Sequence, residues 1–433
     1  MTLPKKFSVL LLACLLTSAL SAQTATRTID ESFAGKQEVN LKQSHGPLTV
    51  QPSTDGQVRV VTRMSVDADE KSEAEAFLAK MEAEFREVGS SLDVSIGIPQ
   101  IKSWNQNNRK TRVVFKDGTR IRDVENFKLE TTLYLPPTDR LGLSIRFEDI
   151  RIDENVELRN LKLGLHNADL RGGNLSGNLD VDMRFGSLEL GNVGGAVSGN
   201  LHNATFELGN TGAVEIDSRF SKIRCGTITT LDFNGHNDRL KLDEVTGKLD
   251  IDDRFGNYII GKTTTGEINS HNGTFDIESG TSYEIEGRFA KVEFSRLEDL
   301  EIRNNHNCNY DLDQVDVVEG DGRFTTLDIE SLTKKAELDI YNGKLYVDEL
   351  APGFREISVD GSFYEVDLDL AGSAEYHVSA ELHFGKVSAP RELTVTEDID
   401  EHGEMRYAAK TAGAGADSAV IRVRGRNGQL RVD

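Results

Sequence analysis

One short element recurs through the middle of this chain at steps of 17 or 18 residues. In each copy an aromatic or asparagine residue ends a stretch of alternating polarity, and apolar residues follow at +3 and usually at +5. Phe and Asn alternate at this key position, which holds Phe147, Asn167, Phe185, Asn203, Phe220, Asn237, Phe255, Asn272, Phe289, Asn307, Phe324, Asn342 and Phe363, with a weaker copy at Phe384. A period this strict predicts a stack of similar turns.

Each copy is surrounded by residues that alternate between apolar and polar, which is typical of β-strands. Leu249, Ile251, Asp253 and Phe255 fall on one face of such a strand, and glycine or asparagine stands at the corners. The sequence therefore predicts an all-β solenoid of short parallel strands. On this pattern the key Phe and Asn residues are expected to point inward, with the asparagines bonding the backbone of their corners.

The length of one turn is left open by the sequence. A turn of 17–18 residues would alternate Phe and Asn along the stack. A turn of 34–35 residues would place Phe on Phe and Asn on Asn, which is favourable in in-register β arrays. The tight corners and short strands favour the 17–18-residue turn.

Four zones divide the chain. Residues 1–22 are expected to be a signal peptide, 23–135 N-terminal strands with a capping helix, 136–390 the solenoid repeats, and 391–433 a C-terminal cap. The helix is predicted at about Asp69–Val88 from its apolar spacing. Within the closing zone, the turn at Gly425–Gly428 suggests a terminal hairpin.

The N-terminus has the features of an export signal. Lys5 and Lys6 precede an apolar stretch, Phe7–Leu20, that is too short to span a bilayer, and Ser21-Ala22 offers a cleavage site. We expect an exported protein of the periplasm, the outer-membrane surface or the medium, with no later membrane-spanning segment. The run Leu11–Cys14 leaves lipidation of Cys14 as an alternative.

Charge and cysteine content narrow the expected partners. The chain carries 50 basic and 72 acidic residues; removal of Lys5 and Lys6 with the signal would change the net charge from −22 to −24. Such a balance disfavours nucleic acid as a partner.

Cys225 and Cys308 lie nearly five steps apart, roughly 23 Å at the usual strand spacing, which is too far for a disulfide.

The strongest candidate for a binding site is an outward stripe of basic residues. Arginine precedes most of the key Phe residues and histidine precedes most of the key Asn residues, so the candidates are Arg184, Arg219, Arg254, Arg288 and Arg323 with His202, His236 and His271, and also His166 and His306. Arginine suits carboxylate, sulfate or phosphate groups. The alternative is a solvated charge ladder, because Asp182, Asp217, Asp252, Glu286 and Asp321 stand two residues before these arginines.

No cofactor, metal site or catalytic residue is predicted. The chain lacks the G-x-S-x-G, H-E-x-x-H and phosphate-loop motifs, and its acidic clusters lack calcium-binding spacing. Turns of nearly constant length predict a smooth surface without a substrate groove.

The repeated corner resembles that of the bacterial "putative adhesin" family of exported proteins of unknown function, related to head-GIN adhesins. The matching segments are Ser270–Ile277, Tyr341–Val347 and the opening Gln43–Val50. The resemblance implies a right-handed parallel β-helix at the cell envelope. We therefore expect a non-enzymatic, adhesin-like binding or scaffold module that contacts a cell-surface glycan or an envelope protein. The alternatives are a polysaccharide-active β-helix enzyme and an envelope regulatory protein.

Overall fold

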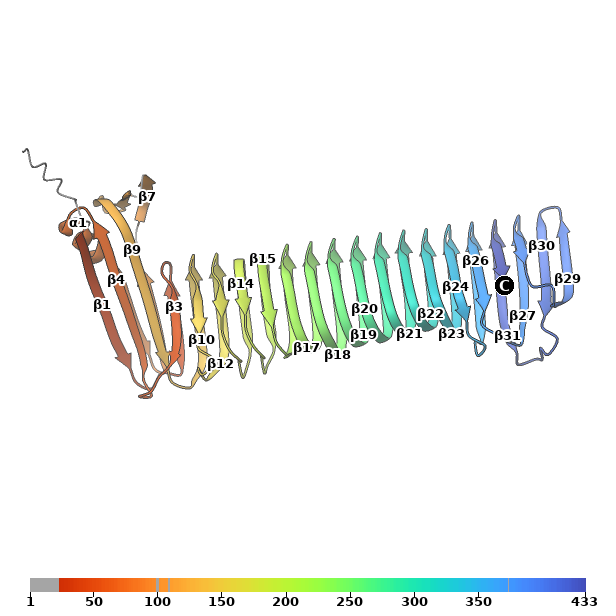
Figure 1. The fold of residues 1–433 in the computed structure, drawn as a ribbon, viewed down its shortest axis with the longest axis horizontal. Helices are drawn as coiled ribbons and strands as arrows, with labels where there is room; N and C mark the ends of the chain where they lie inside the picture. Colours follow the sequence, from red (N-terminus) through yellow and green to blue (C-terminus); the bar gives the residue numbers. More distant parts are fainter. Residues whose placement is uncertain (1–22, 99–100, 108–109, 373) are drawn as a thin grey trace, which may run out of the picture.

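Parallel strand pairing joins each turn of the chain to the next in a long β-solenoid (Figure 1). This computed structural model describes residues 23–98, 101–107, 110–372 and 374–433. Leu231 pairs with Leu249, and Leu249 pairs in turn with Gly266, so successive turns are offset by 18 and 17 residues. The predicted parallel β-solenoid is confirmed, and of the two turn lengths left open the 17–18-residue turn is correct.

The body of the solenoid is built from strands that each run from one corner towards the next. They are β10 (Thr138–Arg146), β11 (Ile150–Ile152), β12 (Leu158–His166), β13 (Leu170–Arg171), β14 (Leu179–Glu189), β15 (Val197–Leu208), β16 (Thr211–Arg219), β17 (Lys222–His236), β18 (Arg239–Arg254), β19 (Asn257–His271), β20 (Thr274–Arg288), β21 (Lys291–His306), β22 (Asn309–Arg323), β23 (Thr326–Tyr341) and β24 (Lys344–Leu350).

At the N-terminal end, β2 (Glu38–Gln43) and β3 (Leu48–Pro52) form a first turn that pairs in parallel with β10 and β11. Antiparallel strands then close this end: β1 (Gln23–Phe33), β4 (Val58–Ala68), β5 (Glu82–Val88), β6 (Ser91–Gly97), β7 (Ile101–Asn107), β8 (Lys110–Phe115) and β9 (Arg120–Leu135). Helix α1 (Lys71–Ala79) buries Ala74, Phe77 and Leu78, and it is shorter than predicted because residues 82–88 form a strand.

At the C-terminal end, the order of turns in space differs from the order in sequence. The last turn, β31 (Ala419–Arg426) and β32 (Gln429–Val432), lies between β25 (Glu356–Ser362) with β26 (Glu365–Leu370) and β27 (Tyr376–His383) with β28 (Lys386–Ser388) (Figure 1). The predicted hairpin at Gly425–Gly428 is therefore wrong, since both strands pair in parallel with neighbouring turns. The antiparallel strands β29 (Thr394–Glu401) and β30 (Glu404–Lys410) close the stack.

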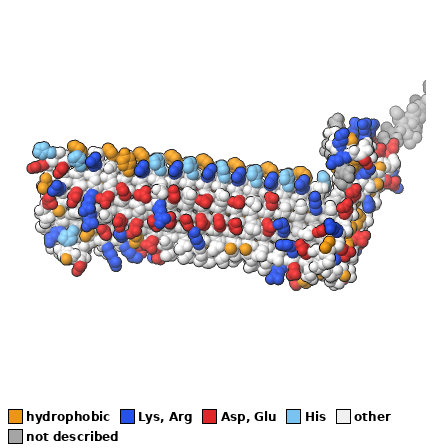
Figure 2. Space-filling view, turned by 180° about the vertical axis from the view of Figure 1, so that it is seen from behind, with side chains coloured by type: hydrophobic (Ala, Val, Ile, Leu, Met, Phe, Trp, Pro, Cys, Tyr) orange, Lys and Arg blue, Asp and Glu red, His pale blue; other side chains and the backbone are white. Residues whose placement is uncertain are grey.

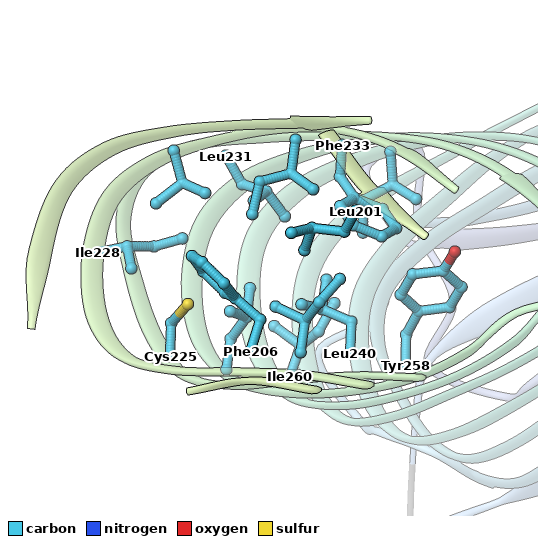
Figure 3. Close-up of a cluster of buried hydrophobic side chains, with 14 of the residues drawn as sticks. Leu201, Phe206, Cys225, Ile228, Leu231, Phe233, Leu240, Tyr258 and Ile260 are labelled. Carbon is cyan, nitrogen blue, oxygen red and sulfur yellow. The ribbon is translucent and has the colours of Figure 1, made fainter. Parts of the chain in front are cut away.

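The interior is a continuous column of apolar side chains. Figure 3 shows Phe206, Cys225, Ile228 and Phe233 meeting between the two long sides of the flattened coil. Cys225 and Cys308 are buried free thiols, and burial raises the pKa of Cys225 to about 12, so it packs as a small apolar residue.

Within the described part of the chain, no helix has the length and apolarity to cross a lipid bilayer.

A candidate binding surface along the corner ridge

The key Phe and Asn residues lie at corners with left-handed backbone and point outward. Phe220 and Phe255 have φ values of 56° and 64°, and their side chains are 51% and 50% exposed. The left-handed residue interrupts the in–out alternation, so Arg254 and Phe255 both face solvent while Gly256 is buried. The predicted inward orientation of these corner residues is therefore wrong. Leu249, Ile251 and Asp253 do point inward as predicted.

Phenylalanine is an unfavourable choice for this backbone. A residue with a Cβ in the left-handed region loses roughly 1–2 kcal/mol, and Asn adopts it more readily than a bulky residue does. Phe147, Phe185, Phe220, Phe255, Phe289, Phe324, Phe363 and Phe384 nevertheless occupy it, at φ between 54° and 67°, and all are exposed. Neither backbone preference nor core packing accounts for these side chains, so the reason for them lies at the surface.

The exposed phenylalanine rings alternate with the histidines of the intervening turns. Centroids of neighbouring rings lie 5.4–6.3 Å apart, mostly in edge-to-face geometry, within the range of favourable aromatic pairs. We call this row the aromatic ladder: Phe147, His166, Phe185, His202, Phe220, His236, Phe255, His271, Phe289, His306, Phe324, Tyr341 and Phe363. Figure 2 shows it along one long edge of the molecule.

Each histidine of the ladder is oriented by the corner asparagine that follows it. The Asn237 Nδ2 amide donates to His236 Nδ1 over 3.0 Å, and the pairs at 166/167, 202/203, 271/272 and 306/307 repeat this bond at 2.6–3.1 Å. An amide nitrogen can only donate, so Nδ1 accepts and the neutral ring carries its proton on Nε2. The corner asparagines thus bond the histidine side chain beside them.

Strand register brings the predicted site residues into one row. Arg184 pairs with His202, Arg219 with His236, Arg254 with His271, and Arg288 with His306, while Arg323 lies beside Tyr341. All five arginines are exposed. Among the described residues, no ion pair within 4.0 Å joins any of them to an acid. The acids that stand two residues before these arginines do not contact them as ion pairs, so the guanidinium groups are available to an external group.

A long shallow groove of about 1470 Å³ runs beside this row, so the expected smooth surface is wrong here. One wall is the Arg and His row from His166 to Arg288. The other wall carries residues two positions earlier in the chain, where acids alternate with asparagine: Asp182, Asn200, Asp217, Asn234, Asp252, Asn269 and Glu286. The groove therefore has a two-turn repeat, with an Asp-x-Arg-Phe or Glu-x-Arg-Phe turn followed by an Asn-x-His-Asn turn.

Two buried carboxylates lie beneath the groove. Asp253 accepts hydrogen bonds from Tyr258 Oη at 2.7 Å and Ser270 Oγ at 3.1 Å. Asp238 accepts from the backbone of Ser221 and His236, both at 2.7 Å. Burial raises the pKa of both carboxyl groups, and the hydrogen bonds oppose this shift. Their oxygens are engaged inside the solenoid, so these groups serve to hold the corners.

Comparisons with known proteins add little beyond the fold. Residues 7–112 match the model of the gastrin/cholecystokinin family, which is less than half of the chain and does not establish membership. The search of curated proteins gives no match.

Several solved structures are similar in architecture. A "putative adhesin" from Bacteroides fragilis has 13% identity and a TM-score of 0.31, over 63% of this chain and 97% of its own. A "putative cell adhesion protein" from Clostridium sporogenes has 10% identity and a TM-score of 0.16, over 95% and 98%. A "putative lipid binding protein" from Parabacteroides distasonis has 13% identity and a TM-score of 0.18, over 78% and 96%. At these values the similarity carries no argument about function.

Proposed function

We propose that this chain is an exported, non-enzymatic, adhesin-like module of the bacterial cell envelope that binds its partner through the aromatic ladder and the adjoining groove. The observation that carries the proposal is the repeated placement of exposed phenylalanine in a backbone conformation that disfavours it. Strained residues that the surrounding structure maintains are concentrated at functional sites. Aromatic and arginine side chains are also the types that contribute most to binding energy.

The site residues proposed to contact the partner are those of the outward row and the corner rings next to it. Arg184, Arg219, Arg254, Arg288 and Arg323 supply donors, and His202, His236 and His271 supply both rings and Nε2–H groups. Export is supported by the charged and apolar pattern of residues 1–22. A cell-surface glycan or an envelope protein fits such a long, repetitive surface.

The chain itself supplies the variant that tests this proposal. Replacing Phe220, Phe255 and Phe289 by Asn copies the residue found at the same corner of alternate turns, so we expect an intact fold. Each lost aromatic contact is expected to weaken binding by about 1 kcal/mol, giving a loss of about a hundredfold in affinity for isolated cell envelopes. Co-sedimentation with envelope fractions measures this.

The matched control replaces two exposed apolar residues away from the ladder, Ile259→Asn with Val395→Asn, which are 45% and 50% exposed. This control should retain wild-type binding. Unchanged retention of a folded Phe220/Phe255/Phe289 variant would remove the ladder from the proposed function. Release of new reducing ends from envelope polysaccharide by the wild-type protein would overturn its non-enzymatic part and favour the polysaccharide-active alternative.

A further inference from the structure

We infer that the partner of this surface is a linear acidic glycan that lies along the ladder and groove, with its acidic groups against the arginines and its hydroxyls towards the row of carboxylates. This inference rests on the proposed function of the ladder as a binding surface. Three observations support it: the charge of the surface beside the groove, the spacing of the arginines, and the hydrogen-bonding groups of the two groove walls.

From the Arg184 turn to the Tyr341 turn, the strip of surface on the ladder side of the groove carries no acidic residue, although the whole chain has a net charge of −22. The flanking turns carry Asp169 and Glu365 in this strip, so the acid-free stretch is bounded at both ends. Three outward columns make up this strip: the Arg and His row, the corner residues, and the residues two positions after each corner. From the Arg184 turn to the Tyr341 turn, the third column holds Ser187, Thr205, Lys222, Arg239, Asn257, Thr274, Lys291, Asn309, Thr326 and Lys344. With the five arginines of the row, the strip carries nine permanent positive charges and no negative one.

The strip is bordered by acids on both sides. Asp217 and Asp252 lie across the groove, and Asp276 and Asp311 lie beyond the third column. Figure 2 shows rows of acidic side chains running parallel to the ladder. In the central turns, the acids beyond the third column are interrupted by Arg224, Lys241 and Ile259. An anionic chain is therefore attracted to the strip and repelled chiefly from the groove side and from the outer side of the later turns, which gives position and orientation more than raw affinity.

The spacing of the arginines favours a polymer of low charge density. They recur every second turn, about 9.6 Å apart at the usual strand separation. A nucleic acid strand carries a phosphate about every 3.4 Å, so most of its charges would meet histidine or asparagine, or the acids beside the strip. An extended glycan with an acidic group on alternate sugars repeats on the order of the arginine spacing.

The groove also offers both kinds of hydrogen-bonding partner. Carboxylates such as Asp217 and Asp252 accept hydrogen bonds, whereas the amides of Asn234 and Asn269 both donate and accept. Sugar hydroxyls donate and accept, and the apolar faces of sugar rings can pack on the exposed phenylalanines. A phosphate backbone has no donor for the carboxylate wall. A glycan satisfies both walls, so it is the class of polymer that we assign.

The inference is tested with purified protein and a panel of polymers in a direct binding assay. The acidic glycans are hyaluronan and chondroitin sulfate, which carry a carboxylate on alternate sugars, and the comparisons are neutral dextran and single-stranded DNA. We expect at least one acidic glycan to bind while dextran and DNA do not. Changing Arg219, Arg254 and Arg288 to Gln should weaken that binding about tenfold, as expected for three partly solvated ion pairs.

The matched control changes three exposed arginines off the strip, Arg159, Arg296 and Arg391, to Gln, which alters net charge equally. It should bind as the wild type does. Equal binding of dextran, stronger binding of DNA, an equal loss in the control, or no binding of any acidic glycan would each overturn the inference. So would a dimer, seen by light scattering, that the ladder arginine variant dissociates, because a second copy would then occupy the surface. If the protein binds envelopes through the phenylalanines but binds no acidic glycan, the proposed function stands and only this inference is removed.

Discussion

Deleting residues 419–433 is expected to destabilise the C-terminal third of the solenoid and to cause aggregation, although it removes only the end of the chain. These residues form β31 and β32, which lie inside the stack and pair with turns on both sides. Ile421, Val423, Leu430 and Val432 are fully buried. Their loss alone removes roughly 6–12 kcal/mol of apolar burial.

The deletion also leaves β25 and β26 unpaired on the side that faced the last turn, while β23 and β24 still pair with their other side. An open parallel edge is prone to aggregation. Thermal unfolding followed by circular dichroism and the elution volume in size-exclusion chromatography measure the effect. The comparison is removal of the β29–β30 hairpin, residues 394–410, with the ends rejoined by a short linker. This change should be milder because every residue of β29 is exposed. Equal effects of the two deletions would contradict the inserted position of the last turn.

The buried carboxylate Asp253 is expected to make stability fall as pH rises. Its folded-state pKa is raised above the ordinary value of 3.8 by burial and by nearby Asp238. The folded protein therefore binds more protons than the unfolded chain between these two values. The stabilising contribution is complete below about pH 3.8 and is lost as pH rises through the folded-state pKa, at up to about 1.4 kcal/mol per pH unit.

Asp253→Asn removes this proton uptake and can keep the bonds to Tyr258 and Ser270, since its amide oxygen accepts and the serine hydroxyl can rotate. Relative to wild type, this variant should gain stability as the pH rises above about 4, where the wild-type carboxyl group must lose its proton inside the fold. Urea unfolding at several pH values measures the difference. The control is Asp252→Asn, the exposed neighbour on the outer face. A parallel pH profile for Asp253→Asn and wild type would show that the carboxyl group titrates alike in both states.

The fold could be predicted because its repeat is local. The 17–18-residue period and the alternation at Leu249, Ile251 and Asp253 together specify parallel turns with an apolar interior. The basic row could also be predicted, since Arg219 and Arg254 precede the key residues at a constant position. Parallel register then places them side by side with His236.

The direction of the corner side chains was missed because strict alternation assigns Phe255 to the core. The left-handed residue breaks that alternation, and a hydrophobic side chain at such a corner contradicts the usual pattern of burial. A signal was present in the sequence. Asn237 and Asn272 occupy the same position as Phe255, and a column shared with asparagine is more consistent with a left-handed corner than with an apolar core.

The order of the last turns could not be predicted from local pattern, because pairing between distant segments decides it. The structure shows a regularity that the linear sequence hides. Phe363 and Phe384 are successive key residues along the chain, yet Asn427 lies between them in space. The alternation of Phe and Asn is thus preserved through the inserted turn, and so is the left-handed corner, with φ of 50° at Asn427.

On a linear site such as the ladder, each additional pair of turns should add binding energy. Isothermal titration with tetra-, hexa-, octa- and decasaccharides of whichever acidic glycan binds tests it most directly. We expect affinity to rise at each step, as the ligand reaches a further arginine from Arg184 towards Arg323, and to rise less steeply in the Phe220/Phe255/Phe289 variant. If the tetrasaccharide binds as tightly as the decasaccharide, the protein has a single local site, which would contradict binding along the whole ladder.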